Sequence, residues 1–147
     1  MSDKEQVHVK LGLSGTYWDR KPQYRVSAND QILIEGTITA ESDQIEYLEF
    51  DVSYDSAEST LKIELLGKEF SDTVQNADKT EILKDMLLNI VSIEIDEVNL
   101  GQIPYTHSKY HPAGREEVIE NCVNLGWNGA WTLTWTNPFY IWLLENI

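Results

Sequence analysis

Basic residues, cysteine and long apolar runs are all scarce in this chain of 147 residues. Lys and Arg total 11 against 25 Asp and Glu, which gives a formal net charge of −14. Nucleic acids and anionic membrane surfaces bind basic patches, so neither is expected as a partner. The single cysteine, Cys122, excludes an intrachain disulfide. The longest uninterrupted apolar run, residues 139–144, is far shorter than the roughly 20 residues of a membrane-spanning helix.

A secretory signal is also missing from the start of the sequence. Residues 1–5 are polar and no apolar stretch follows them, so we expect synthesis in the cytoplasm without a signal peptide. Hydrophobic residues make up 41% and charged residues 24%, which is ordinary for a folded domain. The length predicts a single domain over residues 1–147. We expect its core in residues 5–103, with a C-terminal extension over residues 104–147 that completes the sheets or forms an interface.

What the sequence has in abundance is alternation of apolar and polar residues with a period of two. Turn-forming pairs such as Asn29-Asp30 and Asn128-Gly129 separate about eight alternating runs, each the length of a short strand. One sheet with a wet face cannot supply a core for this length, so two sheets must pack face to face. The sequence therefore predicts an all-β fold, an antiparallel β-sandwich of jelly-roll type with one or two short helical turns. The main runs are residues 7–11, 32–38, 48–54, 61–65, 93–96, 131–136 and 139–144.

Two segments are candidates for the helical turns. In residues 78–88, Asp78 would be the N-cap and Glu81 follows it at capping-box spacing, although a loop with a turn fits the same residues. Residues 115–122 are the second candidate, and residues 104–114 are expected to form a long loop or a joint. A strand at residues 139–144 would be apolar on both faces, so it is either central in a covered sheet or buried against another chain. The second alternative indicates self-association through the C-terminal segment.

Aromatic and polar side chains occur together in the loop Tyr17, Trp18, Asp19 and Arg20. Aromatic rings stack on the C–H face of a pyranose, and planar polar groups bind neighbouring hydroxyls, so this mixture is typical of sugar recognition. Trp127 is a further candidate for the same glycan-binding surface. The alternative is that these rings cap the open end of the sandwich.

Acidic side chains offer one candidate metal site. Asp78, Glu81 and Asp85 could converge from one loop, and carboxylate oxygens are the ligands that calcium prefers. Solvated surface carboxylates are the alternative, and no EF-hand pattern is present.

Catalysis is not expected, because the sequence has no nucleophile elbow and no metalloprotease motif, and Cys122 has no signature of a nucleophile. Glu49 and Asp51 share a strand face and could serve a glycosidase if they lined a cleft, but alternating acids on a solvent-facing sheet explain them equally well.

A more specific pattern runs through residues 21–103. It consists of residues 22–26, the turn Asn29-Asp30, strands at residues 47–54 and 61–65, and Asp85 before an apolar run. In these residues the chain resembles the small β-sandwich carbohydrate-binding modules that need calcium and bind xylan. The resemblance implies a glycan ligand and calcium as cofactor, with Asp85 as a ligand of the ion. Leu87 and Val91 stand where that family has a polar residue and a second Asp.

The chain as a whole, including residues 124–129 and 137–140, also resembles small proteins encoded by tailed marine phages. This second resemblance implies a place in the virion and other virion proteins as partners. Three hypotheses follow. The first is a non-catalytic binding module on a phage particle. The second is a virion assembly or decoration protein without a glycan ligand. The third is a small carbohydrate-active enzyme.

Overall fold

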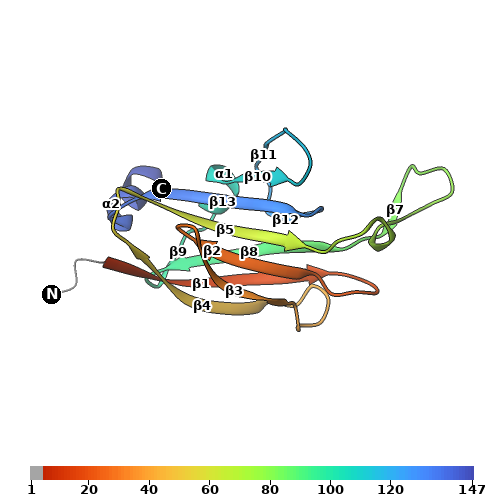
Figure 1. Ribbon diagram of the computed structural model, residues 1–147, viewed down its shortest axis with the longest axis horizontal. Coiled ribbons are helices and arrows are strands. Elements are labelled where there is room, and N and C mark those ends of the chain that lie inside the picture. The colour runs from red at the N-terminus through yellow and green to blue at the C-terminus, as the bar shows by residue number, and fades with distance from the viewer. Residues whose placement is uncertain (1–4) are drawn as a thin grey trace.

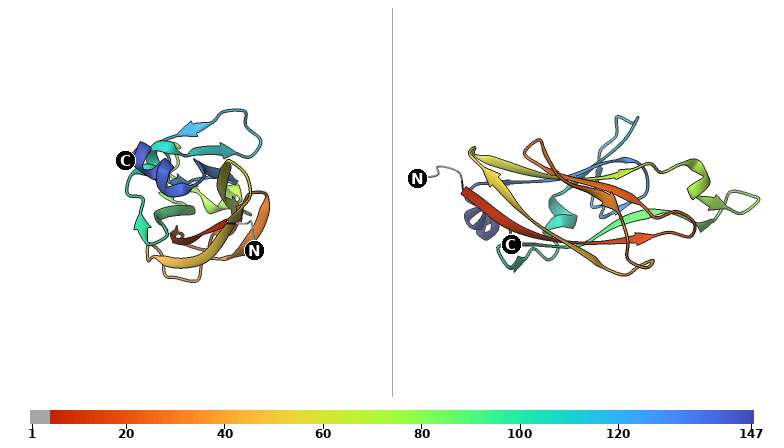
Figure 2. Two further views of the ribbon diagram at one scale, coloured as in Figure 1. Left: turned by 90° about the vertical axis from the view of Figure 1, so that its left-hand side faces the viewer. Right: turned by 60° about the horizontal axis from the view of Figure 1, so that its bottom comes forward.

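Two antiparallel sheets pack face to face in the computed structural model, which describes residues 5–147 (Figure 1). Sheet A has the strand order β12-β8-β1-β4, with β9 paired to β8, and sheet B has the order β11-β10-β13-β5-β2-β3. A separate hairpin, β6-β7, projects from one end, and helix α2 lies at the opposite end (Figures 1 and 2). The prediction of an all-β sandwich with few helical turns is confirmed.

The strands differ widely in length, and the long ones form the centre of each sheet. Sheet A contains β1 (Glu5–Thr16), β4 (Glu46–Tyr54), β8 (Leu87–Ile95), β9 (Val98–Asn99) and β12 (Asn124–Leu125). Sheet B contains β2 (Gln23–Ala28), β3 (Gln31–Thr37), β5 (Glu58–Leu66), β10 (Lys109–Pro112), β11 (Ile119–Glu120) and β13 (Gly129–Thr136). The hairpin consists of β6 (Val74–Gln75) and β7 (Ile82–Lys84). The helices are the 3-10 helix η1 (Phe70–Asp72), α1 (Ile103–His107) and α2 (Phe139–Asn146).

The core lies between the two sheets and follows from the period-two alternation. On β1 the inward residues are fully or almost fully buried while polar residues face outward. The largest fully buried side chains are Trp131 and Trp135 on β13, which pairs with β5 over its whole length. Each fully buried large apolar side chain contributes about 1.5–3 kcal/mol relative to exposure, so this layer holds the sheets together. No helix within residues 5–147 is both long enough and apolar enough to span a bilayer.

The expected strand at residues 139–144 is wrong, because these residues begin helix α2. Pro138 is the N-cap residue, and its ring fixes a φ of −74°. Phe139 and Trp142 are three residues apart and therefore share one helix face. The Phe139 ring lies 6.0 Å from that of Trp135 and 6.1 Å from that of Trp142, which places both helical rings against the core. The argument for self-association rested on a strand with two apolar faces, so it loses its basis.

The helical turn expected at residues 78–88 is also wrong. The chain instead makes a tight turn between β6 and β7, in which Asn76 Oδ1 accepts the backbone N–H of Thr80 at 2.9 Å and of Glu81 at 3.3 Å. Lys79 has a φ of 57°, a left-handed conformation that a right-handed helix cannot contain. Asp78 therefore lies in a turn and is not an N-cap.

The other irregular segments also differ from expectation. Residues 115–122 contain no helix, and their one regular element is β11, which pairs with β10. Residues 104–114, expected as a loop or a joint, supply most of α1 and all of β10. These short elements depend on pairing with β13 and on packing, which no local sequence pattern reveals.

Candidate functional site

Three aromatic side chains gather around η1 at the hairpin end of the sandwich. Trp18 comes from the loop between β1 and β2, Phe70 begins η1, and Trp127 lies between β12 and β13. The Phe70 ring lies 5.1 Å from the Trp127 ring at an interplanar angle of 32°. Phe70 is 86% exposed and Trp18 is 43% exposed. We call these three residues the aromatic end.

Trp18 is held by η1 and by the hairpin. Its indole Nε1 donates a hydrogen bond to the backbone oxygen of Asp72 at 3.0 Å. The ammonium group of Lys84 on β7 lies 5.0 Å from the centre of its ring, a cation–π contact. The indole is thus fixed at its polar edge while much of the ring remains accessible.

Arg20 holds η1 in place through its guanidinium group, while its side chain remains 40% exposed. Its Nε donates to Asp72 Oδ1 at 3.0 Å, its Nη2 donates to Asp72 Oδ2, and Nη2 also reaches the Gly67 oxygen at 3.0 Å. The Asp72 carboxylate is almost fully buried and also accepts the N–H of Glu69 at 2.8 Å. The Arg20 guanidinium holds the pKa of Asp72 below its ordinary value.

Trp127 is fixed through its backbone and through the neighbouring loop. The Tyr110 hydroxyl donates to the Trp127 oxygen and accepts the Trp127 N–H at 3.2 Å. Next in sequence, Asn128 exchanges two hydrogen bonds with the backbone of Lys68, at 2.7 and 2.9 Å. This pairing brings residues 126–128 beside the segment that carries Phe70, although the two lie about 60 positions apart in the chain.

Asp85, whose side chain is 22% exposed, forms an ion pair with the buried Lys68 next to the aromatic end. Its Oδ1 accepts hydrogen bonds from Lys68 Nζ at 2.7 Å, from Thr73 Oγ1 at 2.6 Å and from the Met86 N–H at 2.8 Å. Lys68 Nζ also donates to the Gly126 oxygen at 2.6 Å, and the lysine side chain is only 1% exposed. Burial raises the pKa of Asp85, but the hydrogen bonds from Lys68 and Thr73 outweigh it and the pKa lies below its ordinary value.

These residues do not fit a calcium ion. Calcium takes six to eight oxygen ligands, whereas the Asp85 carboxylate already faces an ammonium group that would repel the ion. Asp78 and Glu81 lie exposed in the turn between β6 and β7. Within residues 5–147, no group of three or more His, Cys, Asp or Glu side chains is placed to hold a metal ion.

Tyr17 faces away from the aromatic end. The Tyr17 hydroxyl donates to the Ala40 oxygen at 2.9 Å, and its N–H donates to Ser42 Oγ at 3.3 Å, so this side chain faces the segment between β3 and β4. Asp19 is exposed beside Trp18 and Arg20 in the sequence. Of the five residues proposed for the glycan surface, the structure brings three together around η1 and Lys68: Trp18, Arg20 and Trp127. Arg20 binds Asp72 and so holds η1 in place.

Glu49 and Asp51 both bind the imidazole of His8 on the outer face of sheet A. His8 Nε2 lies 3.0 Å from Glu49 Oε1, and His8 Nδ1 lies 2.9 Å from Asp51 Oδ1. Hydrogen bonds to these two carboxylates raise the pKa of His8, and all three side chains are about half exposed. Both carboxylates are therefore engaged with one base on an exposed strand surface, which is not the paired geometry of a glycosidase.

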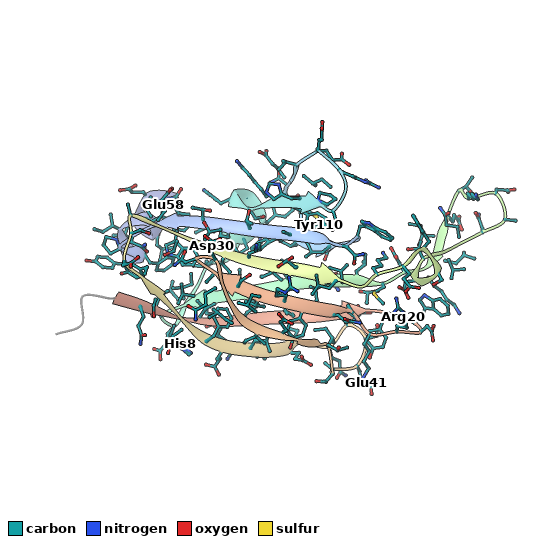
Figure 3. The ribbon with its side chains drawn as sticks, in the orientation of Figure 1. His8, Arg20, Asp30, Glu41, Glu58 and Tyr110 are labelled. Carbon is teal, nitrogen blue, oxygen red and sulfur yellow. The ribbon has the colours of Figure 1, made fainter. Side chains whose placement is uncertain are left out.

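A polar groove that sequence reasoning missed lies on the outer face of sheet B. It has a volume of about 630 Å³ and extends between the β2-β3 turn and the β4-β5 turn. Asp30 and Glu58, which line it, lie toward the end of the sandwich opposite to Arg20 (Figure 3). Its residues come from five strands and two turns, so no single sequence motif marks it.

The two-sheet architecture is similar to that of solved β-sandwich structures of carbohydrate-binding modules. A solved structure of vCBM60 in complex with galactobiose matches with a TM-score of 0.55 at 7% sequence identity, over 86% of this chain and 96% of that one. The selenomethionine form of vCBM60, from work on a circular permutation that links two families of calcium-dependent carbohydrate binding modules, matches with a TM-score of 0.53 at 8% identity, over 86% and 89%. No protein-family profile and no curated protein sequence matches the chain. At this identity the likeness establishes the fold.

Proposed function

We propose that this protein is a non-catalytic carbohydrate-binding module that binds a glycan through the aromatic end. The observation that carries the proposal is the 86% exposure of Phe70, whose ring lies against Trp127 beside the half-exposed Trp18. Exposed aromatic rings that are grouped together mark a binding surface more often than a singly exposed ring does, and sugar rings present C–H faces that stack on such rings. The vCBM60 fold is known in complex with galactobiose, which makes this disaccharide the first ligand to test.

The rings are rigidly supported, which favours binding without a large ordering cost. Arg20 fixes η1 through Asp72, while Lys68 joins Asp85 to the loop that carries Trp127. Polar groups for sugar hydroxyls are close by, since the Lys84 ammonium lies over the Trp18 ring.

Calcium is not required in this proposal. In the sequence resemblance Asp85 is a calcium ligand, but here its carboxylate pairs with Lys68. The Lys68 ammonium bridges the Asp85 carboxylate and the Gly126 oxygen, so a positive charge already joins these two segments. Glycan binding through the aromatic end is therefore expected to persist in the presence of EDTA.

Titration calorimetry with galactobiose and longer galactans tests the proposal. Phe70→Ala and Trp18→Ala each remove one stacking surface and are expected to weaken binding by about 1–2 kcal/mol, which is roughly 5- to 30-fold. Tyr140→Ala is the matched control, because Tyr140 is 65% exposed on α2 at the opposite end. Equal binding by all three variants would show that the sugar does not stack on the aromatic end.

A virion assembly role is the second candidate, and the exposed face of α2 favours it. Tyr140, Ile141 and Leu144 are 65%, 46% and 70% exposed, which leaves an apolar helix surface open to a partner. Light scattering of the purified protein, and its detection in purified phage particles, test this candidate. If the protein binds no glycan and is detected in purified phage particles, the assembly role is favoured over the carbohydrate-binding role. An enzyme is the weakest candidate, because Glu49 and Asp51 both bind His8.

A further inference from the structure

We infer that the polar groove on the outer face of sheet B is a second binding site, specific for non-acidic saccharides and independent of the aromatic end. At about 630 Å³ the groove lies within the size range of small-molecule sites. Its floor includes Thr60 and Lys62 of β5, Thr132 of β13 and Ser27 of β2, all of them hydrogen-bonding residues.

Ser27 provides the observation that points to a ligand. Its hydroxyl is buried, the residue is only 3% exposed, and within residues 5–147 the Oγ atom has no hydrogen-bond partner. A buried hydroxyl without a partner costs about 1–3 kcal/mol of stability, so such groups are rare unless something binds them. Ser27 lines the groove, but its Oγ is itself covered by surrounding atoms, so a bound sugar hydroxyl would supply the missing hydrogen bond once the serine side chain turns toward the groove.

The walls of the groove are fixed before any ligand arrives. Asn29, in the β2-β3 turn, exchanges backbone and side-chain hydrogen bonds with Thr60: Asn29 N donates to Thr60 O at 3.1 Å, and Thr60 N donates to Asn29 Oδ1 at 2.9 Å. Asn29 Nδ2 also donates to the Ser53 oxygen at 3.1 Å, which joins this turn to β4. A preformed site avoids the entropy cost of ordering loops on binding.

The charges around the groove determine which sugars it accepts. Asp30, Asp55 and Glu58 supply three exposed carboxylates against the single ammonium of Lys62. Carboxylates accept hydrogen bonds from sugar hydroxyls, whereas they repel the carboxylate of a uronic acid. The groove therefore selects neutral or amino sugars and rejects acidic ones.

Chemical-shift mapping of the labelled protein with two size-matched sugars tests the inference. Galactobiose is expected to shift the amides of Ser27, Thr60 and the two turns, and digalacturonate is expected to leave them unchanged. Ser27→Ala is expected to weaken groove binding by roughly 2- to 10-fold, the value of one hydrogen bond, without loss of stability. Ser108→Ala is the matched control, since within the described residues 5–147 Ser108 has the other buried hydroxyl without a partner, and it lies outside the groove.

A second variant tests the selectivity directly. Asp55→Asn with Glu58→Gln removes two exposed charges without a change of shape, and digalacturonate is then expected to shift the groove amides. The inference would be overturned if galactobiose left the chemical shifts of the groove amides unchanged, or if the two sugars shifted these amides equally. Groove shifts without shifts at Trp18 and Trp127 would overturn the proposed aromatic end and leave the groove standing, so the two proposals fail separately.

Discussion

Lys68 has its ammonium group almost wholly inside the protein, with Asp85 and the Gly126 oxygen as partners. Removal of one partner from a buried pair leaves an uncompensated charge, so Lys68→Met is expected to cost about 3–5 kcal/mol of unfolding free energy. Lys84→Met is the control, because a surface change of this kind usually stays within about 0.5 kcal/mol. Urea denaturation measures both. Addition of Asp85→Asn to Lys68→Met is expected to recover part of the loss, and no recovery would show that the pairing is not what stabilises this region.

The same pair predicts how the protein responds to calcium. A ligand that binds only the folded state raises the melting temperature, so a calcium site would appear as a shift at millimolar calcium and its reversal by EDTA. Neither is expected here, because Lys68 faces Asp85. A clear rise with calcium, absent in Asp85→Asn, would contradict the assignment of Lys68 as the resident cation.

His8 offers a prediction about pH. Hydrogen bonds to Glu49 and Asp51 raise its pKa above the ordinary 6.5, so the stabilising charge pair is fully present below about that pH and is lost as the pH rises through the folded-state pKa. Glu49 has a lowered pKa through the His8 hydrogen bond, so its share is lost as the pH falls below its ordinary 4.5. NMR titration is expected to show a pKa for His8 above 6.5 that falls in Glu49→Gln. An unchanged value in that variant would remove Glu49 as the main cause.

At the residue scale, the sequence predicts which loops carry exposed aromatic side chains better than it predicts which residues hold those side chains in place. Trp18 and Trp127 stand out because large aromatic residues in turn-rich segments have few structural reasons to be there. Phe70 and Lys68 lie in a segment without periodicity, and their partners Trp127, Asp85 and Gly126 are distant in sequence. The sequence predicts that Arg20 binds ligand, whereas in the fold its guanidinium pairs with Asp72 of η1, a residue 52 positions away.

At the scale of elements, the apolar run 139–144 shows where a local pattern is ambiguous. A short continuous apolar run fits a buried strand or a helix equally well, and only the contact with Trp135 selects the helix. By contrast, the strict alternation of residues 48–54 leaves one interpretation, and β4 has the expected burial pattern. The sequence predicts long amphipathic strands, whereas it does not predict short elements that depend on tertiary contacts.

Two substitutions in α2 test whether residues 139–144 form a helix or the strand that their apolar sequence suggests. On a strand, Trp142 and Leu144 would share a face and lose similar burial, whereas on α2 Trp142 is 8% exposed and Leu144 is 70% exposed. Trp142→Ala is therefore expected to cost about 3–5 kcal/mol, and Leu144→Ser to stay within about 0.5 kcal/mol. Equilibrium unfolding in urea measures both values. Similar losses in the two variants would favour the strand.

For the whole molecule, charge sets the pH at which the fold is most stable. The net charge of −14 at pH 7 makes the acidic residues repel one another, and protonation toward the isoelectric point near 4.4 relieves that repulsion. Charging of His8 adds stability in the same direction. Both effects predict that stability rises as the pH falls from about 8 to about 5.

Below about pH 5 the effect of pH on stability reverses, and a further fall in pH destabilises the fold. Asp72 and Asp85 have pKa values below the ordinary 3.8, so their contributions are present above that pH and are lost as the pH falls through the folded-state values. Because these two carboxylates hold η1 and the Lys68 loop, the aromatic end is expected to loosen first in acid. Calorimetric melting between about pH 3 and pH 8 is expected to give a maximum near pH 5, with added salt raising the melting temperature at pH 8 far more than at pH 5. A melting temperature that rises steadily up to pH 8 would mean that the buried pairs, and not the surface charge, dominate over the whole range.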